Sequence, residues 1–231
     1  MSPANPLLVP STLPYGLPDF SAIRDEHVMP ALEEALRRHT AEIAAIADSP
    51  EEPTAANTVV ALEQSGQDLA RVLGYFYTVA GADATEERLR MEAEISPLLA
   101  QHSDDMYMNP QLFHRIDAVF QTLPESVGSI EAKGGVTAAQ LEAETVALAQ
   151  RYHDLFLRHG AGLSAEAQAR VREINAELSQ LSSEFGDNLL KDTQARAVHI
   201  MEECKLAGVD DAQKHFFADT ARAAGMTGWL I

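Results

Sequence analysis

The sequence predicts a mainly all-α protein with one or two short strands near its C-terminus. Apolar residues recur at intervals of three and four along most of the chain, which is the period of a helix that buries one face. Ser, Thr, Asp or Asn precedes several of these runs, as expected for residues that cap helix N-termini. A short, partly alternating stretch appears only after residue 195. With 231 residues and a 46% hydrophobic composition, the chain can bury a sizeable core.

The first segment, residues 1–18, is predicted to be an extended arm docked on the surface. Five prolines interrupt it, and each restricts the residue before it to an extended backbone. The apolar side chains expected to attach the arm are Leu7, Leu8, Leu13 and Tyr15.

Residues 19–194 are predicted to form a helical domain. Its first helix follows a turn capped by Asp19, carries Pro30 near its start and ends near residues 48–50. The apolar face of this helix comprises Leu32, Leu36, Ile43 and Ile46.

The second predicted helix begins after Asn57 or Thr58, either of which can cap it. Its apolar stripe comprises Val59, Leu62, Leu69, Val72, Leu73, Phe76 and Val79. We expect this helix to continue through Gly66, because a glycine inside a helix permits close packing against a neighbour. The third helix begins after Thr85, and Pro97 is expected to kink it.

Two more helices are predicted in the middle of the chain. Asn109 and Pro110 open the fourth helix. Residues 124–135 contain three glycines and little periodicity, which predicts an exposed loop. Thr137 and Gln140 then form a capping box for the fifth helix.

The longest predicted helix begins after Ser164. Its apolar seam comprises Val171, Ile174, Leu178, Leu181, Phe185 and Leu189. Residues 195–231 follow as a predicted strand, helix and strand that lead into a further domain. The strand candidates, residues 196–201 and 228–231, pair with each other or with strands of another segment, and the helix between them covers residues 211–224.

The charge balance is strongly acidic. The chain has 17 Lys and Arg against 35 Asp and Glu, a formal net charge of −18. This charge repels phosphate backbones and anionic lipids, so we expect neither nucleic acid nor a membrane as a partner. The acidic residues are spread along the chain, which is typical of solvated helix faces.

The sequence favours a cytoplasmic protein. Its one cysteine, Cys204, cannot form an internal disulfide, whereas secreted frameworks normally contain an even number. The N-terminus has no basic region followed by an apolar run, so we expect no signal peptide. No apolar run approaches the 18 residues that a membrane span needs.

One predicted helix carries a candidate group of metal ligands. Asp211, His215 and Asp219 recur every four residues, so they can present two carboxylates and an imidazole on one face. In so acidic a chain, this spacing is more typical of a solvated face. His199 and Glu203 are a weaker pair, because they straddle the end of a predicted strand. The metallopeptidase motif H-E-x-x-H does not occur.

Candidates for nucleophilic or acid–base chemistry are equally weak. Cys204 lies among acidic neighbours that repel a thiolate, which favours a structural cysteine. His27, His153 and His159 can act as acids or bases, but spacing alone places no partner beside them. The residues therefore identify no catalytic residue, no cofactor-binding residue and no metal ligand.

Four segments nevertheless resemble a known family. They are NPLLVPSTLPYGLPDFSAIRDEHVMPALEEAL at residues 5–36, NTVVALEQSGQDLARV at 57–72, EISPLLAQHSDDMYMNPQLFHRIDAV at 94–119 and GAGLSAEAQARVREINAELSQLSSEFGDNLL at 160–190. Together with KLAGVDDA and GMTGWLI near the end, they are similar to the N-terminal region of the thimet oligopeptidase (M3) family of zinc metallopeptidases. The STLPY and ALEQSG stretches favour its peptidyl-dipeptidase branch over its oligopeptidase A branch.

The resemblance implies a non-catalytic role. Members of the family are much longer and carry their zinc ligands, H-E-x-x-H and a later glutamate, in the C-terminal half. It therefore implies a helical N-terminal portion that forms one wall of a channel for short, unfolded peptides. The implied partners are the C-terminal catalytic domain of the same protein and short peptides. Zinc is implied for the parent enzyme, which releases dipeptides from peptide C-termini, but not for this chain, which should be inactive alone.

Three alternatives stay open at this stage. The chain can be a fragment of an oligopeptidase A-type endopeptidase, or a free-standing helical domain that binds peptides or proteins without enzymatic activity. It can also be an unrelated enzyme that uses His215 or Cys204. Under the family interpretation, the apolar residues 228–231 are expected to lead into the rest of the enzyme. An uncovered apolar patch is then expected to cause weak self-association or dye binding.

Overall fold

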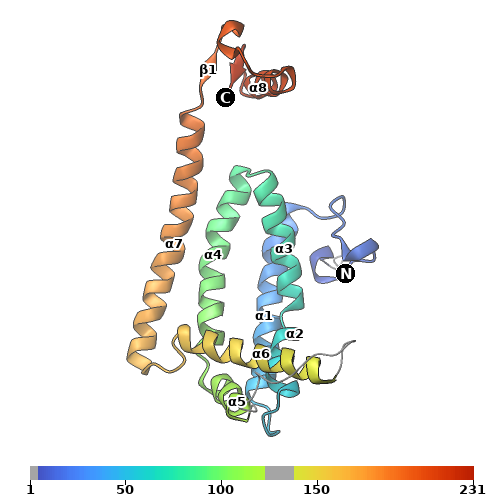
Figure 1. The fold of residues 1–231 in the computed structure, drawn as a ribbon, viewed down its shortest axis with the longest axis vertical. Coiled ribbons are helices and arrows are strands. Elements are labelled where there is room, and N and C mark those ends of the chain that lie inside the picture. The colour runs from blue at the N-terminus through green and yellow to red at the C-terminus, as the bar shows by residue number, and fades with distance from the viewer. Residues whose placement is uncertain (1–4, 123–137) are drawn as a thin grey trace. The chain divides into compact units, whose positions relative to one another are not determined.

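A computed structural model of the chain describes residues 5–122 and 138–231 (Figure 1). The chain divides into two compact units, Met1–Gln180 and Leu181–Ile231, and the boundary between them lies within one long helix. Helices dominate the described residues, and the strands found there are two short ones near the C-terminus. The prediction of a mainly all-α fold is therefore confirmed. The predicted loop 124–135 and Thr137 lie outside the described residues.

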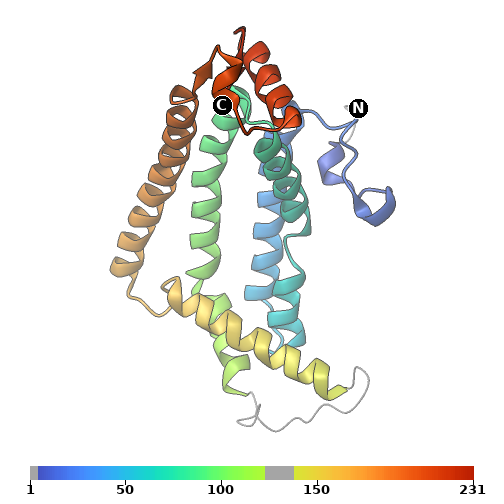
Figure 2. The same ribbon diagram turned by 45° about the horizontal axis from the view of Figure 1, so that its top comes forward.

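Three long helices lie side by side in the first unit (Figure 1). They are α1 (Val28–Ala47), α3 (Gln67–Ala82) and α4 (Glu86–Tyr107). Helix α1 contacts both of the others. Two further helices, α5 (Pro110–Gln121) and α6 (Ala138–Arg158), pack against each other. Figure 2 shows α6 crossing near one end of the three long helices.

The first unit contains two clusters of buried apolar side chains. One lies among α1, α3 and α4, and its fully buried large members include Leu32, Val72, Phe76 and Ile95. The other joins the end of α1 to α5 and α6, and its fully buried members include Val59, Leu112, Ile116 and Phe156. Both clusters draw on the apolar faces that the helical periodicity predicts.

Several predicted caps are confirmed. The Thr85 hydroxyl accepts a hydrogen bond from Arg88 N (3.3 Å), so α4 begins where the sequence predicts. The Asn109 side chain accepts from Leu112 N (2.9 Å) at the start of α5. Helix α4 continues as one element through Pro97.

The second predicted helix is wrong in two respects. Its first turn is a π-helical turn, η4 (Ala56–Val60), and Asn57 does not cap it but accepts from Thr54 N (2.8 Å). The helix also stops at Gly66, so that a short α2 (Ala61–Gln64) precedes α3. Gly66 has φ +70°, a left-handed conformation that costs other residues about 1–2 kcal/mol. The helical periodicity of the sequence does not reveal this break, because the apolar stripe continues on both sides of Gly66.

The arm is attached differently from the prediction. Leu7 lies in a 3-10 turn (Pro6–Leu8), is 1% exposed and belongs to the cluster among α1, α3 and α4. Leu8 packs against the same cluster, as predicted. Leu13 and Tyr15 were expected to be attachment points, but they are 44% and 100% exposed. The arm is therefore anchored through Leu7 and Leu8, whereas Tyr15 makes no apolar attachment to the described part of the chain.

Helix α7 (Ala165–Ala195) is the longest helix described. It begins after Ser164, whose hydroxyl accepts from Ala167 N (3.3 Å), as the sequence predicts. In the first unit, its polar side chains face α4. Asn175 donates to Asp104 Oδ1 (2.7 Å), and Arg172 lies 3.8 Å from an Asp105 carboxylate oxygen.

The second unit contains β1 (His199–Ile200), α8 (Asp211–Ala223) and β2 (Trp229–Leu230). The strands pair antiparallel with each other, in the register His199 to Leu230 and Ile200 to Trp229. Helix α8 contacts β2, and the buried side chains here include Leu206 and Ala221. Of the two pairings left open by the sequence, the structure therefore contains the internal one.

Candidate functional site

Helix α7 carries a stripe of exposed apolar side chains. It comprises Ile174, Leu178, Leu181, Phe185 and Leu189, and we call it the α7 stripe. Their spacings of four, three, four and four residues place them on one helical face. Each is between 39% and 70% exposed. Contiguous exposed apolar surface of this kind marks an interaction site in a soluble protein.

The orientation of α7 strengthens this interpretation. An ordinary surface helix turns its apolar face toward the core and its polar face toward water. In the first unit, α7 instead contacts its neighbours through Gln168, Arg172 and Asn175, which lie on another face from the stripe. Gln168 donates to Gly160 O (3.0 Å), and Asn175 donates to the buried Asp104. These polar bonds hold the first-unit part of α7 with Ile174 and Leu178 exposed.

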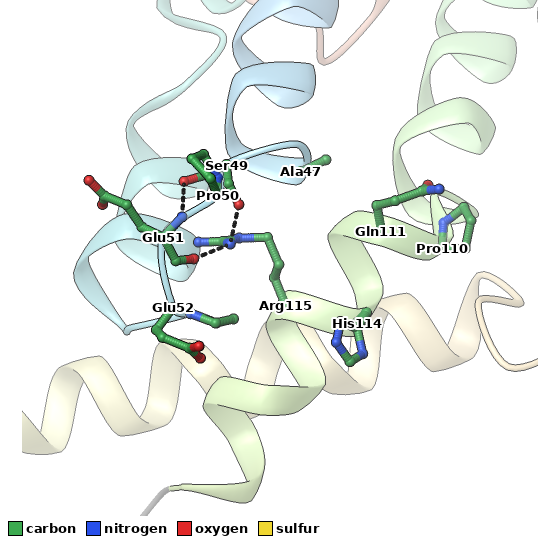
Figure 3. Close-up of a pocket in the computed structure, with 10 residues that line it drawn as sticks. Ala47, Ser49, Pro50, Glu51, Glu52, Pro110, Gln111, His114 and Arg115 are labelled. Carbon is green, nitrogen blue, oxygen red and sulfur yellow. Dashed lines mark hydrogen bonds between the residues drawn. The ribbon is translucent and has the colours of Figure 1, made fainter.

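A cavity of about 400 Å³ lies where α1 ends and α5 begins (Figure 3). Its lining includes Ser49, Glu51 and Glu52 from the loop after α1, and His114 and Arg115 from α5. Arg115 is only 5% exposed, and its guanidinium donates to Ser49 O (3.0 Å) and Glu51 O (2.8 Å).

Arg115 therefore fastens the loop after α1 to α5. It also donates to Asn57 Oδ1 (3.1 Å), and Asn57 in turn bonds Glu52 O (3.0 Å). A cation that satisfies two backbone carbonyls and one amide is a structural connector, so we assign the cavity no catalytic role. The sequence signal for Arg115 is that it interrupts the apolar face formed by Leu112 and Ile116.

Two histidines form a hydrogen-bonded chain between α1 and α4. His39 Nδ1 lies 2.9 Å from His102 Nε2, and His39 Nε2 lies 3.1 Å from Ser65 Oγ. Ser65 donates its hydroxyl proton to Leu62 O (2.7 Å), so it must accept from His39 Nε2. His39 Nδ1 then carries no proton and accepts from His102 Nε2. The chain of bonds thus runs from α4 through α1 to the break between α2 and α3.

The pKa values of both histidines are lowered, which favours their neutral form. Burial lowers the pKa of His39, the charge of His102 lowers it further, and Glu42 acts in the opposite direction. Burial also lowers the pKa of His102, with Asp105 opposing it. Protonation of His39 Nδ1 would remove the acceptor of the bond from His102.

We therefore expect mild acid to destabilise the chain through this pair. The unfolded chain binds protons at an ordinary histidine pKa of about 6.5, whereas the folded state resists them. The free energy of unfolding contributed by the pair is thus fully present above about pH 6.5. It falls as the pH drops from there through the lower folded-state pKa values. Urea midpoints measured at pH 7.5 and 5.5 detect the loss.

Two variants, compared with the wild type, isolate the contribution of His39 and His102 to the pH dependence of stability. The double substitution of His39 and His102 by glutamine removes both titrating rings, so the urea midpoint of the variant should depend less on pH in this range. His215→Gln, on the exposed face of α8, serves as the matched control and should keep the wild-type dependence. An equal pH dependence in all three proteins would contradict the assignment.

The candidate metal ligands on α8 do not converge. His215 Nδ1 bonds the Asp211 carbonyl oxygen (2.6 Å), and the Asp219 carboxylate pairs with Arg222 (2.6 Å). His199 Nε2 instead lies 2.6 Å from Thr227 O. Among residues 5–122 and 138–231, no group of three or more His, Cys, Asp or Glu could hold a metal ion. The described residues thus do not fit a zinc site.

The three remaining histidine candidates contact backbone, a carboxylate or aromatic rings, and His153 Nε2 lies 3.2 Å from Asp117 Oδ1. His27 Nδ1 accepts from Arg24 N (3.0 Å) at the start of α1. His153 stacks on Phe120 with ring centroids 3.9 Å apart, and His159 stacks on Tyr107 at 4.2 Å. The other candidate, Cys204, is exposed.

None of the helices in the described parts of the chain is long and apolar enough to cross a membrane.

Comparisons with known proteins show what the chain is related to. No protein-family profile matches it. It is 36% identical over its whole length to "Dipeptidyl carboxypeptidase" of Escherichia coli K12, of which it covers 32%. It is also 36% identical over 98% of its length to the Salmonella typhimurium LT2 protein of the same name, covering 32% of it. "Oligopeptidase A" of Haemophilus influenzae is 28% identical over 99% of the chain, which covers 31% of that protein.

The chain thus spans about a third of the length of the curated relatives it matches. The match runs through all the elements described above, from the arm to β2. Two kinds of peptidase match along the whole chain, and the higher identity is to the dipeptidyl carboxypeptidases. The chain is thus similar over its whole length to about a third of each of these peptidases of the M3 family, which is consistent with the N-terminal region of that family.

Proposed function

We propose that this chain is the non-catalytic N-terminal portion of a zinc-dependent peptidyl-dipeptidase and forms one wall of its peptide-binding channel. The observation that carries the proposal is a full-length match to only a third of two dipeptidyl carboxypeptidases. The higher identity to these proteins than to the oligopeptidases A favours release of C-terminal dipeptides by the parent enzyme.

The α7 stripe is the proposed contact with the rest of the enzyme. Leu181 and Phe185 are 51% and 70% exposed, although burying such side chains stabilises a protein by about 1.5–3 kcal/mol each. A catalytic portion within the same polypeptide would cover them permanently. The same contact would hold the helical wall at the side of the channel.

In this proposal, the rest of the parent enzyme carries out peptide hydrolysis. The described residues offer no fitting zinc ligands, so we assign no step of peptide hydrolysis to them. Zinc in such peptidases activates the attacking water. This chain contributes packing and shape, which confine short peptides and exclude folded proteins.

A chimera tests the proposal directly. In it, the chain replaces the matching third of E. coli dipeptidyl carboxypeptidase, and the other two-thirds are unchanged. The assay measures dipeptide release from a short peptide in the presence of zinc, with the intact E. coli enzyme as the positive control. We expect release by the chimera and none above buffer by the chain alone.

The contrary outcomes are equally specific. Zinc-dependent peptidase activity in the pure chain would contradict its non-catalytic status. An inactive chimera would favour the free-standing interaction domain. A parallel chimera with the E. coli oligopeptidase A remainder, whose matching part is 25% identical, should be less active relative to its own parent. The reverse order would favour the oligopeptidase A branch.

A further inference from the structure

The arm carries a second exposed apolar surface, separate in sequence from the α7 stripe. Its members, which we call the arm patch, are Val9, Leu13, Tyr15, Leu17 and Phe20. Tyr15 is completely exposed, and the others are between 44% and 55% exposed. Five large apolar side chains within 12 residues are far more than the scattered exposed residues of an ordinary surface.

The segment that presents the arm patch is braced at both ends. Leu7 and Ile23, on either side of it, are buried in the first unit. Within it, Ser11 Oγ donates to Leu17 O (2.6 Å) and accepts from Leu13 N (3.1 Å). The Arg71 guanidinium also donates to Leu7 O (3.3 Å). The loop is therefore organised before it meets any partner, which reduces the entropy lost on docking.

Tyr15 adopts a conformation that its surroundings do not explain. It has φ +61°, and it forms a tight turn with Gly16 (φ +68°) in which Leu17 N donates to Pro14 O (3.4 Å). A left-handed backbone is a genuine outlier for a bulky residue and persists where other contacts compensate for it. Because its side chain is completely exposed, it has no packing in the described residues that could compensate.

A recess of about 330 Å³ lies beside the arm patch. Its lining is mostly apolar and includes Leu7, Val9, Leu13 and Ile23, with the Arg71 side chain also contributing. The arm patch therefore combines projecting side chains with a hollow that an apolar side chain of a partner can enter.

We propose that the arm patch docks permanently on the part of the same polypeptide that lies outside this chain, with Tyr15 inserted into that part. This inference rests on the proposed function and adds a second contact to the α7 stripe. Under the proposed function the parent protein has the length of the relatives, about three times that of this chain, which leaves ample polypeptide to cover the arm patch. A permanent partner compensates for the Tyr15 backbone at all times, which a transient peptide substrate does not. A second copy is disfavoured by repulsion between chains of charge −18.

The first test changes only the strained residue. Asparagine tolerates the left-handed conformation, so Tyr15→Asn should raise the Tm of the isolated chain by about 1–3 °C. In the chimera described above, the same substitution removes the inserted ring and should lower the Tm. The inference thus predicts opposite signs in the two proteins. A rise in both, or no change in the chimera, would overturn it.

The second test locates the partner. A photoreactive benzoylphenylalanine at position 15 of the chimera should cross-link within the same polypeptide, to the part contributed by E. coli. The same photoreactive residue at position 157 on α6 is the control and should not cross-link to the E. coli part. Leu157 is suitable because it is about as exposed as Leu13, at 46% and 44%. Leu13→Ser should likewise lower the Tm of the chimera more than Leu157→Ser does.

The outcomes separate this inference from the proposed function. An inactive chimera counts against the proposed function itself. An active chimera that cross-links position 15 to bound peptide, to a second molecule or to nothing overturns the inference alone. An active chimera that cross-links position 15 to its E. coli part supports both.

Discussion

Replacing both Leu181 and Phe185 by serine is expected to destabilise the chimera strongly and the isolated chain hardly at all. Exposed side chains away from special features usually change the free energy of unfolding by less than about 0.5 kcal/mol. If the remainder of the enzyme buries both, their loss should cost the chimera about 3–6 kcal/mol, from about 1.5–3 kcal/mol for each. Urea unfolding of the two proteins, with and without the substitutions, measures the difference.

A control on another face of α7 makes this result specific. Glu177 is exposed on the same helix but lies outside the α7 stripe, so Glu177→Ser should have little effect in either protein. The isolated wild-type chain should also bind a hydrophobic dye, and it should self-associate more at high salt, which screens its charge of −18. The double substitution should weaken both. Equal destabilisation of chain and chimera would show that the stripe packs within the chain.

Phe156→Ala is expected to cost about 3–5 kcal/mol, because it empties the centre of the cluster that joins α1, α5 and α6. Phe156 is completely buried, and its ring lies 5.1 Å from that of Tyr107 and 6.2 Å from that of Phe113. Urea unfolding followed by circular dichroism measures the loss.

The adjacent residue is the natural control for that experiment. Leu157 is 46% exposed on the same helix, so Leu157→Ala should change the free energy of unfolding by less than about 0.5 kcal/mol. Similar costs for the two substitutions would mean that α6 turns a different face toward α5.

The helices were predictable where local chemistry alone decides them. Thr85 and Asn109 start α4 and α5 because their side chains satisfy backbone N–H groups only three residues away. The two strands were predictable from the sequence, but it was not predictable that they pair with each other. Pairing of Val198 with Ile231 joins residues far apart in the sequence, which no local pattern specifies.

The misjudged positions share a physical cause. Gly66 breaks the second helix because its backbone N–H donates to Glu42 on α1 (2.7 Å) and the His39 ring packs beside it. Tyr15 was expected to attach the arm because apolar side chains usually seek burial. Both outcomes depend on whether another segment of the folded chain contacts the residue. The periodicity of the surrounding sequence does not contain that information.

The sequence by itself determined the helical class, most helix starts and the similarity to the peptidases, because caps, apolar spacing and sequence similarity depend on residues that are close together in the chain. Only the tertiary structure decided which apolar faces stay uncovered. The α7 stripe and the apolar face of α1 have similar helical spacing, yet Leu32 and Ile43 of α1 are buried, while α7 turns Asn175 toward α4. Whether an apolar helix face is buried depends on how much apolar surface of other segments lies next to it, and only the folded chain determines that.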